Sequence, residues 1–507
     1  MPETERKFRV HGLFRLPALD GPEGIDGVAS VRAGGELDLH ATYYDTADLR
    51  LARSHVTLRR RTGGSDEGWH LKLPTDHPET RTEMRCPLGS GEEEPPAELT
   101  DLVIALTRGS RIEPVAELRT QRSVVDLLDE SGDVLAELTD DSVSVLDGDH
   151  VAARFREIEV ELGTATSGLL DAVEVLLAQA GAVPGGYASK VSRALGPLAS
   201  APPDLVEPDA PRPQDPAGAV VQAHLAKNVL TLLEMDRQVR LDEPDSVHQM
   251  RVAARRIRSG LKTFAPLVEE SWATGIREEV AWIAGILGAV RDREVLRVRL
   301  LSDLERVSKN SPEIEVAAAA RVIDRALTDE TAAARAGVLE VLRSARYVEL
   351  LETLHQAALA PQLTAAADET AARSLPPLVR RAWRRLDHAV TALSPESDEH
   401  LWHEARIKAK QTRYAAEAVA PVFGKPAKRF ADQVERVTEL LGEHQDAAVA
   451  AHTVSTMASG RKITGPVGFA LGLLHSFEQE TMAGQRKEFR RMWQDVSRPH
   501  WRAWLKP

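Results

Sequence analysis

The sequence predicts a two-domain α+β protein in which an antiparallel β domain precedes an all-α domain. Three observations support this prediction. Residues 1–197 contain short segments of alternating apolar and charged positions, residues 198–216 hold six prolines, and residues 217–507 are rich in Ala, Leu, Arg and Glu with helical periodicity. Because a proline-rich stretch forms a stiff, extended linker, we place the domain boundary at residues 198–216.

Length and composition narrow the class of protein. A chain of 507 residues is too long to fold around a single hydrophobic core. Its composition, with 43% hydrophobic and 28% charged residues, is typical of a globular protein. The net charge of −13 argues against a general nucleic-acid binder. No apolar run approaches the roughly 20 residues of a membrane helix, and the N-terminus lacks the apolar core of a signal peptide. The single cysteine, Cys86, is expected to be structural and fits a cytoplasmic protein.

Charged residues occupy one face of the expected strands. Residues 56–61, 69–73 and 156–162 alternate between apolar and charged positions, and turn signals at 63–66 and 130–133 separate such segments. The chain also begins with Glu3-x-Glu5-x-Lys7, whose three side chains share one face of a strand. Burial of such charges in an open sheet is costly unless each is paired. The pattern therefore favours a sheet that closes around a wet, charged interior.

The charges of this interior suit a phosphate ligand. Arg and Lys bind the many oxygens of a triphosphate, and clustered carboxylates are ligands for Mg²⁺ or Mn²⁺. Hydrolysis of a metal-bound triphosphate then depends on positioning and charge stabilisation, with a carboxylate orienting the water. The alternative interpretation is a polar outer face with cross-strand ion pairs.

The opening segment Glu3-Thr4-Glu5-Arg6-Lys7-Phe8 resembles the E-x-E-x-K signature of the CYTH superfamily, also called triphosphate tunnel metalloenzymes. Further segments follow in the order of that family: 44–46, 58–61, Lys72, 81–83, 157–161 and 189–190. The resemblance covers residues 1–197. It implies an eight-stranded antiparallel tunnel.

The resemblance also implies a metal cofactor, Mg²⁺ or Mn²⁺, bound by carboxylates. A carboxylate or lysine next to the metal would take part in the reaction. The residues implied are Glu3, Glu5, Glu159 and Glu161 for the metal, and Glu3, Glu5, Lys7 and Glu157 for catalysis.

Phosphate-binding cations are implied on several strands of the tunnel. One position stays open, because either Arg119 or Arg122 could face inward. The residues that the resemblance places on the phosphates are Lys7, Arg59, Arg61, Lys72, Arg81, Arg119 and Lys190.

The helical half contains an internal repeat. Segment 248–258 returns as 403–413 after 155 positions, and segment 287–292 returns as 441–446 after 154 positions. A duplicated helical bundle explains this spacing. At about 100° per residue, each basic segment forms a stripe along one helix face. The stripes are His248, Arg251, Arg255, Arg258 and Lys262, and His403, Arg406, Lys410 and Arg413, with Glu417 at the position equivalent to Lys262.

These stripes are expected to bind a polyanion. A solvated surface usually interleaves acids and bases, whereas here cations follow one another and repel. Stacking aromatics, which would suit single-stranded nucleic acid, are almost absent; Tyr414 lies alone beside the second stripe. A linear phosphate chain needs only repeated charge-assisted hydrogen bonds, to which the histidines could add.

The duplicated H-x-x-R-x-x-x-[RK]-x-x-R pattern resembles the CHAD domain, the conserved histidine α-helical domain. The resemblance runs from about residue 216 to the C-terminus. It implies a helical bundle of two pseudo-repeats that binds inorganic polyphosphate.

The leading hypothesis is a metal-dependent triphosphatase that hydrolyses inorganic tripolyphosphate, with long-chain polyphosphate bound by the helical domain, in the cytoplasm or at polyphosphate granules. Other CYTH activities are alternatives: thiamine triphosphatase, nucleoside triphosphatase or adenylate cyclase. An alternative of another class is a non-catalytic polyphosphate-binding or targeting protein. No nucleic acid or membrane partner is expected.

Overall fold

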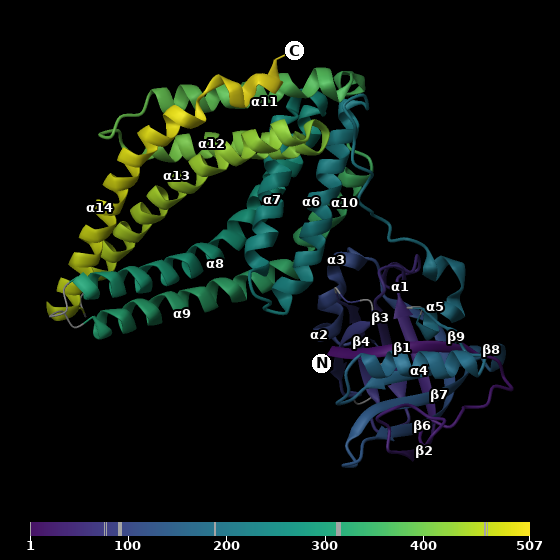
Figure 1. Ribbon diagram of the computed structural model, residues 1–507. Coiled ribbons are helices and arrows are strands. Elements are labelled where there is room, and N and C mark those ends of the chain that lie inside the picture. The colour runs from purple at the N-terminus through teal and green to yellow at the C-terminus, as the bar shows by residue number, and fades with distance from the viewer. Residues whose placement is uncertain are drawn as a thin grey trace. The chain divides into compact units, whose positions relative to one another are not determined.

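The computed structural model describes residues 2–75, 77, 79–89, 94–186, 189–310, 316–460, 463 and 465–506. The side chains of Pro2, Glu3 and Asn310 also lie outside the description. The chain forms two compact units, Met1–Asp204 and Leu205–Pro507 (Figure 1). The division between them falls inside the proline-rich stretch.

The first unit is a closed antiparallel sheet. Eight strands form the ring in the order β5-β4-β3-β2-β6-β7-β8-β1, and β1 pairs with β5 to close it. A ninth strand of two residues adds to β1. The eight-stranded antiparallel tunnel implied by the resemblance is therefore confirmed. The strands are β1 (Pro2–Val10), β2 (Ser30–Asp45), β3 (Thr57–Thr62), β4 (Gly68–Pro74), β5 (Thr80–Cys86), β6 (Glu113–Leu128), β7 (Val134–Asp147), β8 (His150–Leu162) and β9 (Val183–Pro184).

Strand β1 closes the ring because its two halves pair with different neighbours. Residues 2–4 pair with β5, and residues 5–10 pair with β8. In this register Glu5 lies opposite Glu161 and Lys7 lies opposite Glu159. Since directly opposed residues project to the same side of a sheet, these charges share the inner face.

The outer face of β1, β7 and β8 is apolar and is covered by a helix. Phe8, Ile158 and Val160 are buried against Leu170 and Val173 of α4 (Gly168–Gln179). The alternation of apolar and charged residues in these strands thus divides core from tunnel. The other short helices of the unit are α1 (Arg50–Arg53), α2 (Ala97–Thr100), α3 (Ile104–Thr107) and α5 (Lys190–Leu195), with 3-10 turns at Asp101–Val103 and Pro197–Ser200.

Helix α5 is capped at its start and packs on the barrel through its apolar side. Ser189 caps the helix, because its side-chain oxygen accepts a hydrogen bond from the backbone N–H of Ser192 at 3.1 Å. Val191 packs with Tyr43, Leu118 and Val143 of the sheet. This placement directs Lys190, the first residue of the helix, into the barrel.

The second unit is all helical, as predicted. The two basic segments fall in α7 and α12, each of which leads into a long helix, α8 or α13. The long helices pair with α9 and α14 (Figure 1), and a shared apolar core joins the four. The helices are α6 (Ala217–Arg240), α7 (Ser246–Thr263), α8 (Glu270–Asn310), α9 (Ala317–Leu342), α10 (Ala345–Leu359), α11 (Ala371–Thr391), α12 (Glu399–Phe423), α13 (Lys425–Ala458) and α14 (Gly465–Val496), with 3-10 turns at Ala265–Leu267, Ala365–Asp368 and Pro499–Leu505.

The later part of the proline-rich stretch packs on the helical unit. Leu205 is buried, and the carbonyls of Pro213 and Asp215 accept hydrogen bonds from the N–H groups of Ala372 and Ala371 at 2.9 Å. Residues 205–216 are therefore anchored at the start of α11. Within the described residues, no helix is long and apolar enough to cross a membrane.

Asp45 offers a test of the barrel's local stability. Its buried carboxylate accepts hydrogen bonds from the N–H groups of Thr46, Leu51 and Ala52 at 2.7–2.9 Å. Asp45→Ala leaves three amides without an acceptor, so we expect the unfolding free energy of this unit to fall by roughly 2–4 kcal/mol. Hydrogen–deuterium exchange of the barrel strands in urea measures this change.

The control is Asp38→Ala, in the same strand. Asp38 pairs with Arg119 on the surface, where an ion pair contributes little. Equal destabilisation by the two substitutions would contradict the role of Asp45.

Candidate functional site

The barrel encloses a small, highly charged cavity. Its volume is ≈ 90 Å³, and residues from β1 to β6, β8 and the start of α5 line it. Seven cations face five carboxylates among the described residues, so the cavity favours an anion. The cations are Lys7, Arg59, Arg61, Lys72, Arg85, Arg122 and Lys190, and the carboxylates are Glu5, Asp66, Glu83, Glu159 and Glu161.

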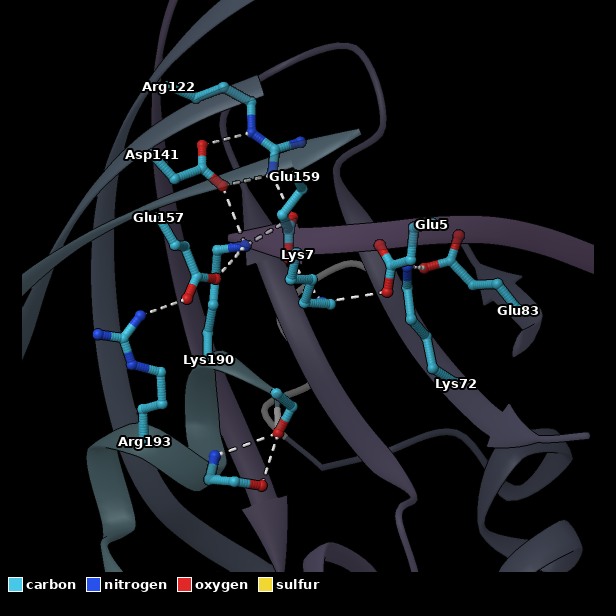
Figure 2. A network of polar contacts seen from close by, with 12 residues as sticks. Glu5, Lys7, Lys72, Glu83, Arg122, Asp141, Glu157, Glu159, Lys190 and Arg193 are labelled. Atoms are coloured by element: carbon cyan, nitrogen blue, oxygen red, sulfur yellow. Dashed lines mark hydrogen bonds and ion pairs between the residues drawn. The ribbon is translucent and has the colours of Figure 1, made fainter. Parts of the chain in front are cut away.

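Lys190 organises the carboxylates of β7 and β8. Its Nζ lies 3.0 Å from Asp141, 3.0 Å from Glu157 and 2.7 Å from Glu159 (Figure 2). Lys7 Nζ lies on the other side of Glu159, at 2.6 Å, and 3.0 Å from Glu5. The two lysines and their carboxylates therefore form one continuous ionic network.

The pKa values of this network favour full ionisation. Burial lowers the pKa of Lys190, but Glu159, Glu157 and Asp141 more than offset this effect and hold the pKa well above its ordinary value. The same balance raises the pKa of Lys7. Burial raises the pKa of Glu159, but Lys190 and Lys7 outweigh it, so this pKa lies well below its ordinary value. Lys190, Lys7 and Glu159 therefore all remain charged near neutral pH.

Cations dominate the strands across the ring. Glu83, which is buried, lies 3.1 Å from His70, 3.8 Å from Lys72 and 3.9 Å from Arg59. Burial and repulsion by Arg59 and Arg122 lower the pKa of Arg61 to about 9, although Arg61 also pairs with the carboxylate of Asp66. A guanidinium among other cations gains from a further anion that approaches it. This side of the cavity is therefore the stronger candidate for phosphate contact.

Most of the predicted tunnel residues come together. Lys7, Arg59, Arg61, Lys72 and Lys190 all line the cavity, together with the proposed metal ligands of β1 and β8 that are described. Arg81 lines an adjoining cavity of ≈ 480 Å³, which shares Glu5, Lys7 and Lys72 with the first. The side chain of Glu3 lies outside the described residues.

Of the two arginines between which the sequence left the choice open, Arg122 faces the tunnel and Arg119 does not. Arg119 lies on the outer face, where it pairs with Asp38 and its side chain is 58% exposed. Arg122 lines the cavity and donates to Asp141 through Nε and Nη2, both at 2.8 Å. The two arginines are three positions apart in β6, so a strand must turn them to opposite faces.

Asp141 and His70 were missed by the analysis of the sequence. Asp141 is fully buried between Arg122 and Lys190. The alternation Glu137-x-Thr139-x-Asp141 in β7 was the available signal, since it matches the pattern of the other strands. His70 showed no comparable signal, because its partner Glu83 comes from another strand.

The carboxylates suit a divalent cation in chemistry and in strand position. Glu5 and Glu161 are directly opposed, and Glu159 follows on the same face. Hard oxygen ligands of this kind are those that Mg²⁺ and Mn²⁺ prefer. Among the described residues, no three His, Cys, Asp or Glu side chains already form a metal-binding group. Glu5 and Glu159 are instead turned to lysines.

The helical unit contains a second cationic site, between the two repeats. Helices α7, α8 and α12 line a cavity of ≈ 280 Å³. Its lining has seven cations and no carboxylate within the described part of the chain. The predicted stripes thus meet at one site. The cations are Arg251, Arg255, Arg258, Lys262, Arg277, Arg406 and Lys410, of which Arg277 was not predicted.

This basic cavity is electrostatically strained. Burial and repulsion by Arg406, Arg255 and Arg251 lower the pKa of Lys410 to about 7. The buried Nε groups of Arg255 and Arg406 have no hydrogen-bond acceptor. Unpaired buried donors are costly, so the cavity is suited to an anionic ligand that supplies acceptors.

The repeats place equivalent ion pairs beside the cavity. Arg251 lies 2.7 Å from Asp292, and Arg406 lies 3.9 Å from Asp446, its counterpart in the second repeat. These aspartates belong to the second repeated segment and orient the arginines. The duplication in the sequence is therefore also a duplication of contacts.

Three predicted residues of the stripes do not line the basic cavity. His248 and His403 lie at the starts of the stripes, and His403 Nδ1 contacts the side-chain oxygen of Gln445 at 2.8 Å. Arg413 pairs with Glu417 at 2.6 Å and with Glu435 at 2.5 Å. The helical periodicity placed these residues on the correct face but could not show which of them have partners from other helices.

Comparisons with known proteins agree with both units. Family profiles match a CYTH domain at residues 1–195 and a CHAD domain at residues 223–455. Two uncharacterized Mycobacterium tuberculosis proteins, from two strains, are 36% identical over 501 residues, which cover 94% of this chain and 93% of theirs. Both resemblances suggested by the sequence are thereby confirmed.

Several solved structures are similar to parts of this chain, and two of them cover just over half of it. PptA from Streptomyces chartreusis is 28% identical, with 55% of this chain and 100% of that chain covered and a TM-score of 0.49. A CHAD domain from the plant Ricinus communis is 22% identical, with 57% and 93% covered and a TM-score of 0.45.

The lowered pKa of Lys410 is directly testable. We expect its amine to react with an acylating reagent with a pH midpoint near 7, because its neutral form is favoured by burial and by neighbouring arginines. Mass spectrometry of the labelled peptide over a pH series measures this midpoint. Lys410→Arg identifies the signal of this residue. A midpoint near the ordinary lysine value, about 10.4, would contradict the strained cavity.

Proposed function

Because this chain belongs to the family of proteins that join a CYTH domain, the domain of the triphosphate tunnel metalloenzymes, to a CHAD domain, we propose that it is a metal-dependent inorganic triphosphatase. In this proposal the tunnel hydrolyses inorganic tripolyphosphate, and the helical unit binds long-chain polyphosphate. CYTH enzymes are triphosphatases or cyclases, and the family depends on metals.

One observation supports the activity above all: in the closed lumen, β3 and β4 carry cations, and most of the carboxylates lie on β1, β7 and β8, where Lys7 and Lys190 pair with them. Arg59 and Lys72 lie on β3 and β4, whereas Glu159 and Asp141 lie on β8 and β7, on the far side of the ring. A triphosphate needs cations along its oxygens and carboxylates near a metal. The lumen offers both within one enclosed space.

The protein's side chains would contribute mainly by position and charge. Arg59, Arg61 and Arg122 would hold phosphoryl oxygens and stabilise the charge that develops during transfer. A divalent cation, Mg²⁺ or Mn²⁺, held by Glu5, Glu159 and Glu161 would supply further neutralisation of phosphate charge.

Glu157 receives a different role in this proposal. It is buried and pairs with Lys190 at 3.0 Å and with Arg193 at 2.7 Å. We therefore assign it to the positioning of α5 rather than to contact with water. Glu5, which lines both cavities, is better placed to orient a water molecule.

The basic cavity of the helical unit supports polyphosphate binding. A bound chain would raise the local concentration of substrate for the tethered tunnel. It would also locate the protein at polyphosphate granules in the cytoplasm.

An organic triphosphate is the second candidate substrate. The adjoining cavity of ≈ 480 Å³ has apolar lining from Ala52, Val56, Pro184 and Ala199. Such a surface could receive the organic part of a nucleoside or thiamine triphosphate, or serve a cyclase.

Phosphate release tests the proposal. We expect release from tripolyphosphate with Mg²⁺ or Mn²⁺, compared with ATP, thiamine triphosphate and long-chain polyphosphate, and a loss of roughly 100-fold or more in Glu5→Gln. Glu117→Gln is the matched control, because Glu117 lies on the outer face beside Arg119. Cyclic AMP from ATP would indicate a cyclase. Inactivity with every substrate, with polyphosphate binding retained, would favour the non-catalytic alternative.

The two arginines of β6 provide a second test. We expect Arg122→Gln to lower kcat/KM for tripolyphosphate by roughly 100-fold, because a phosphate contact inside an enclosed site is lost. Arg119→Gln should change it less than about twofold, because that side chain is on the surface. Steady-state kinetics at several substrate concentrations measures both. Similar losses in the two variants would overturn the assignment of Arg122 to the tunnel.

A further inference from the structure

The two basic helices of the helical unit, α7 and α12, share one sequence pattern, but the residues that surround them differ. Arg258 of α7 corresponds to Arg413 of α12, and Lys262 corresponds to Glu417 (Figure 1 shows both helices). If the repeat alone decided anion binding, Arg258 and Arg413 would contribute equally. The contacts at the two ends differ, however.

At the first-repeat end, cations accumulate without acids. Arg258, Lys262 and Arg277 line the basic cavity. Burial lowers the pKa of Lys262, and repulsion by Lys408, Arg277, Arg385 and Arg258 lowers it further. Residues of four helices, α7, α8, α11 and α12, therefore converge at this point.

These cations also lack competing partners. Within the described residues, no carboxylate forms an ion pair with Arg258, Lys262, Arg277 or Arg385. Among the described residues, Lys408 pairs with one carboxylate, that of the exposed Glu404, at 3.5 Å. An exposed pair of this kind is weak. The positive field at this end is therefore available to a ligand.

At the second-repeat end, carboxylates neutralise the cations. Glu417 accepts from Arg413 at 2.6 Å and from Arg256 at 3.3 Å. Glu435 of α13 pairs with Arg413 at 2.5 Å. A phosphate chain that reached Arg413 would have to displace two carboxylates, and it would meet their negative charge.

We propose that the path followed by an anion on the helical unit is one-sided. The path starts at Arg251 and Lys410, follows α7 past Lys262, and continues to Lys408 of α12 and Arg385 of α11. On the opposite side, the carboxylate of Glu417 ends it. This inference rests on the proposed binding of polyphosphate. It adds Arg277, Lys408 and Arg385, which are not among the basic residues of the repeated pattern, and it removes Arg413, which is one of them. The ligand that fits is a linear polyanion long enough to pass from the cavity to α11.

The test compares equivalent positions of the two repeats in the full chain. Binding of fluorescent long-chain polyphosphate is measured at several salt concentrations for the wild type, Arg258→Gln, Arg413→Gln and Arg385→Gln. Arg373→Gln is the control, since Arg373 lies at the other end of α11 and pairs with Glu369. Thermal unfolding by circular dichroism checks that each variant folds.

We expect Arg258→Gln and Arg385→Gln each to weaken binding roughly three- to tenfold and to reduce its salt dependence, because each removes one charge contact. Arg413→Gln and Arg373→Gln should change affinity less than about twofold. In addition, Glu417→Lys should strengthen binding, because it frees Arg256 and restores the cation of the first repeat.

Other outcomes separate this inference from the function on which it rests. Equal losses in Arg258→Gln and Arg413→Gln, or no loss in Arg385→Gln, would overturn the one-sided path while polyphosphate binding stands. A wild-type chain that fails to bind long-chain polyphosphate would overturn the proposed role of the helical unit itself.

Discussion

The barrel depends on the pairing of charges that its closure encloses. A charge inside a closed sheet has lost most of its water, and an unpaired one costs several kcal/mol. Lys190 supplies the partner charge for Asp141, Glu157 and Glu159 at once. Because Lys190 begins α5, the same contacts fix that helix against β7 and β8. The ionic network of the lumen is thus part of the barrel's framework as well as its candidate chemistry.

The helical unit differs from the barrel in how its buried charges are paired. The barrel balances nearly every lumenal cation with a carboxylate, whereas the basic cavity between α7 and α12 gathers seven cations and leaves buried Nε groups of Arg255 and Arg406 without acceptors. A site that is strained when empty gains more free energy from a polyanion than a site already satisfied. The two units therefore suit different tasks: a defined small anion in the barrel and an extended one on the helices.

Much of this arrangement could be predicted from the sequence, because it follows from local periodicity. Period two separated the apolar face, with Ile158 and Val160, from the charged face, with Glu157 and Glu159. The repeat likewise identified the helices that line the basic cavity. What could not be predicted depends on partners distant in the sequence. The choice of Arg122 over Arg119 required the register of β6, and the loss of Arg413 from the site required Glu435 on another helix.

The position of β1 as the strand that closes the ring has a consequence for synthesis of the chain. Lys7 is synthesised 152 positions before its partner Glu159. During translation residues 5–10 of β1 therefore lack their partner strand until β8 has left the ribosome, a stage at which strands are prone to aggregate. Its alternating charges, Glu5, Arg6 and Lys7 among them, oppose such association. The charged residues of β1, two of which line the lumen, thus also protect this strand before it is paired.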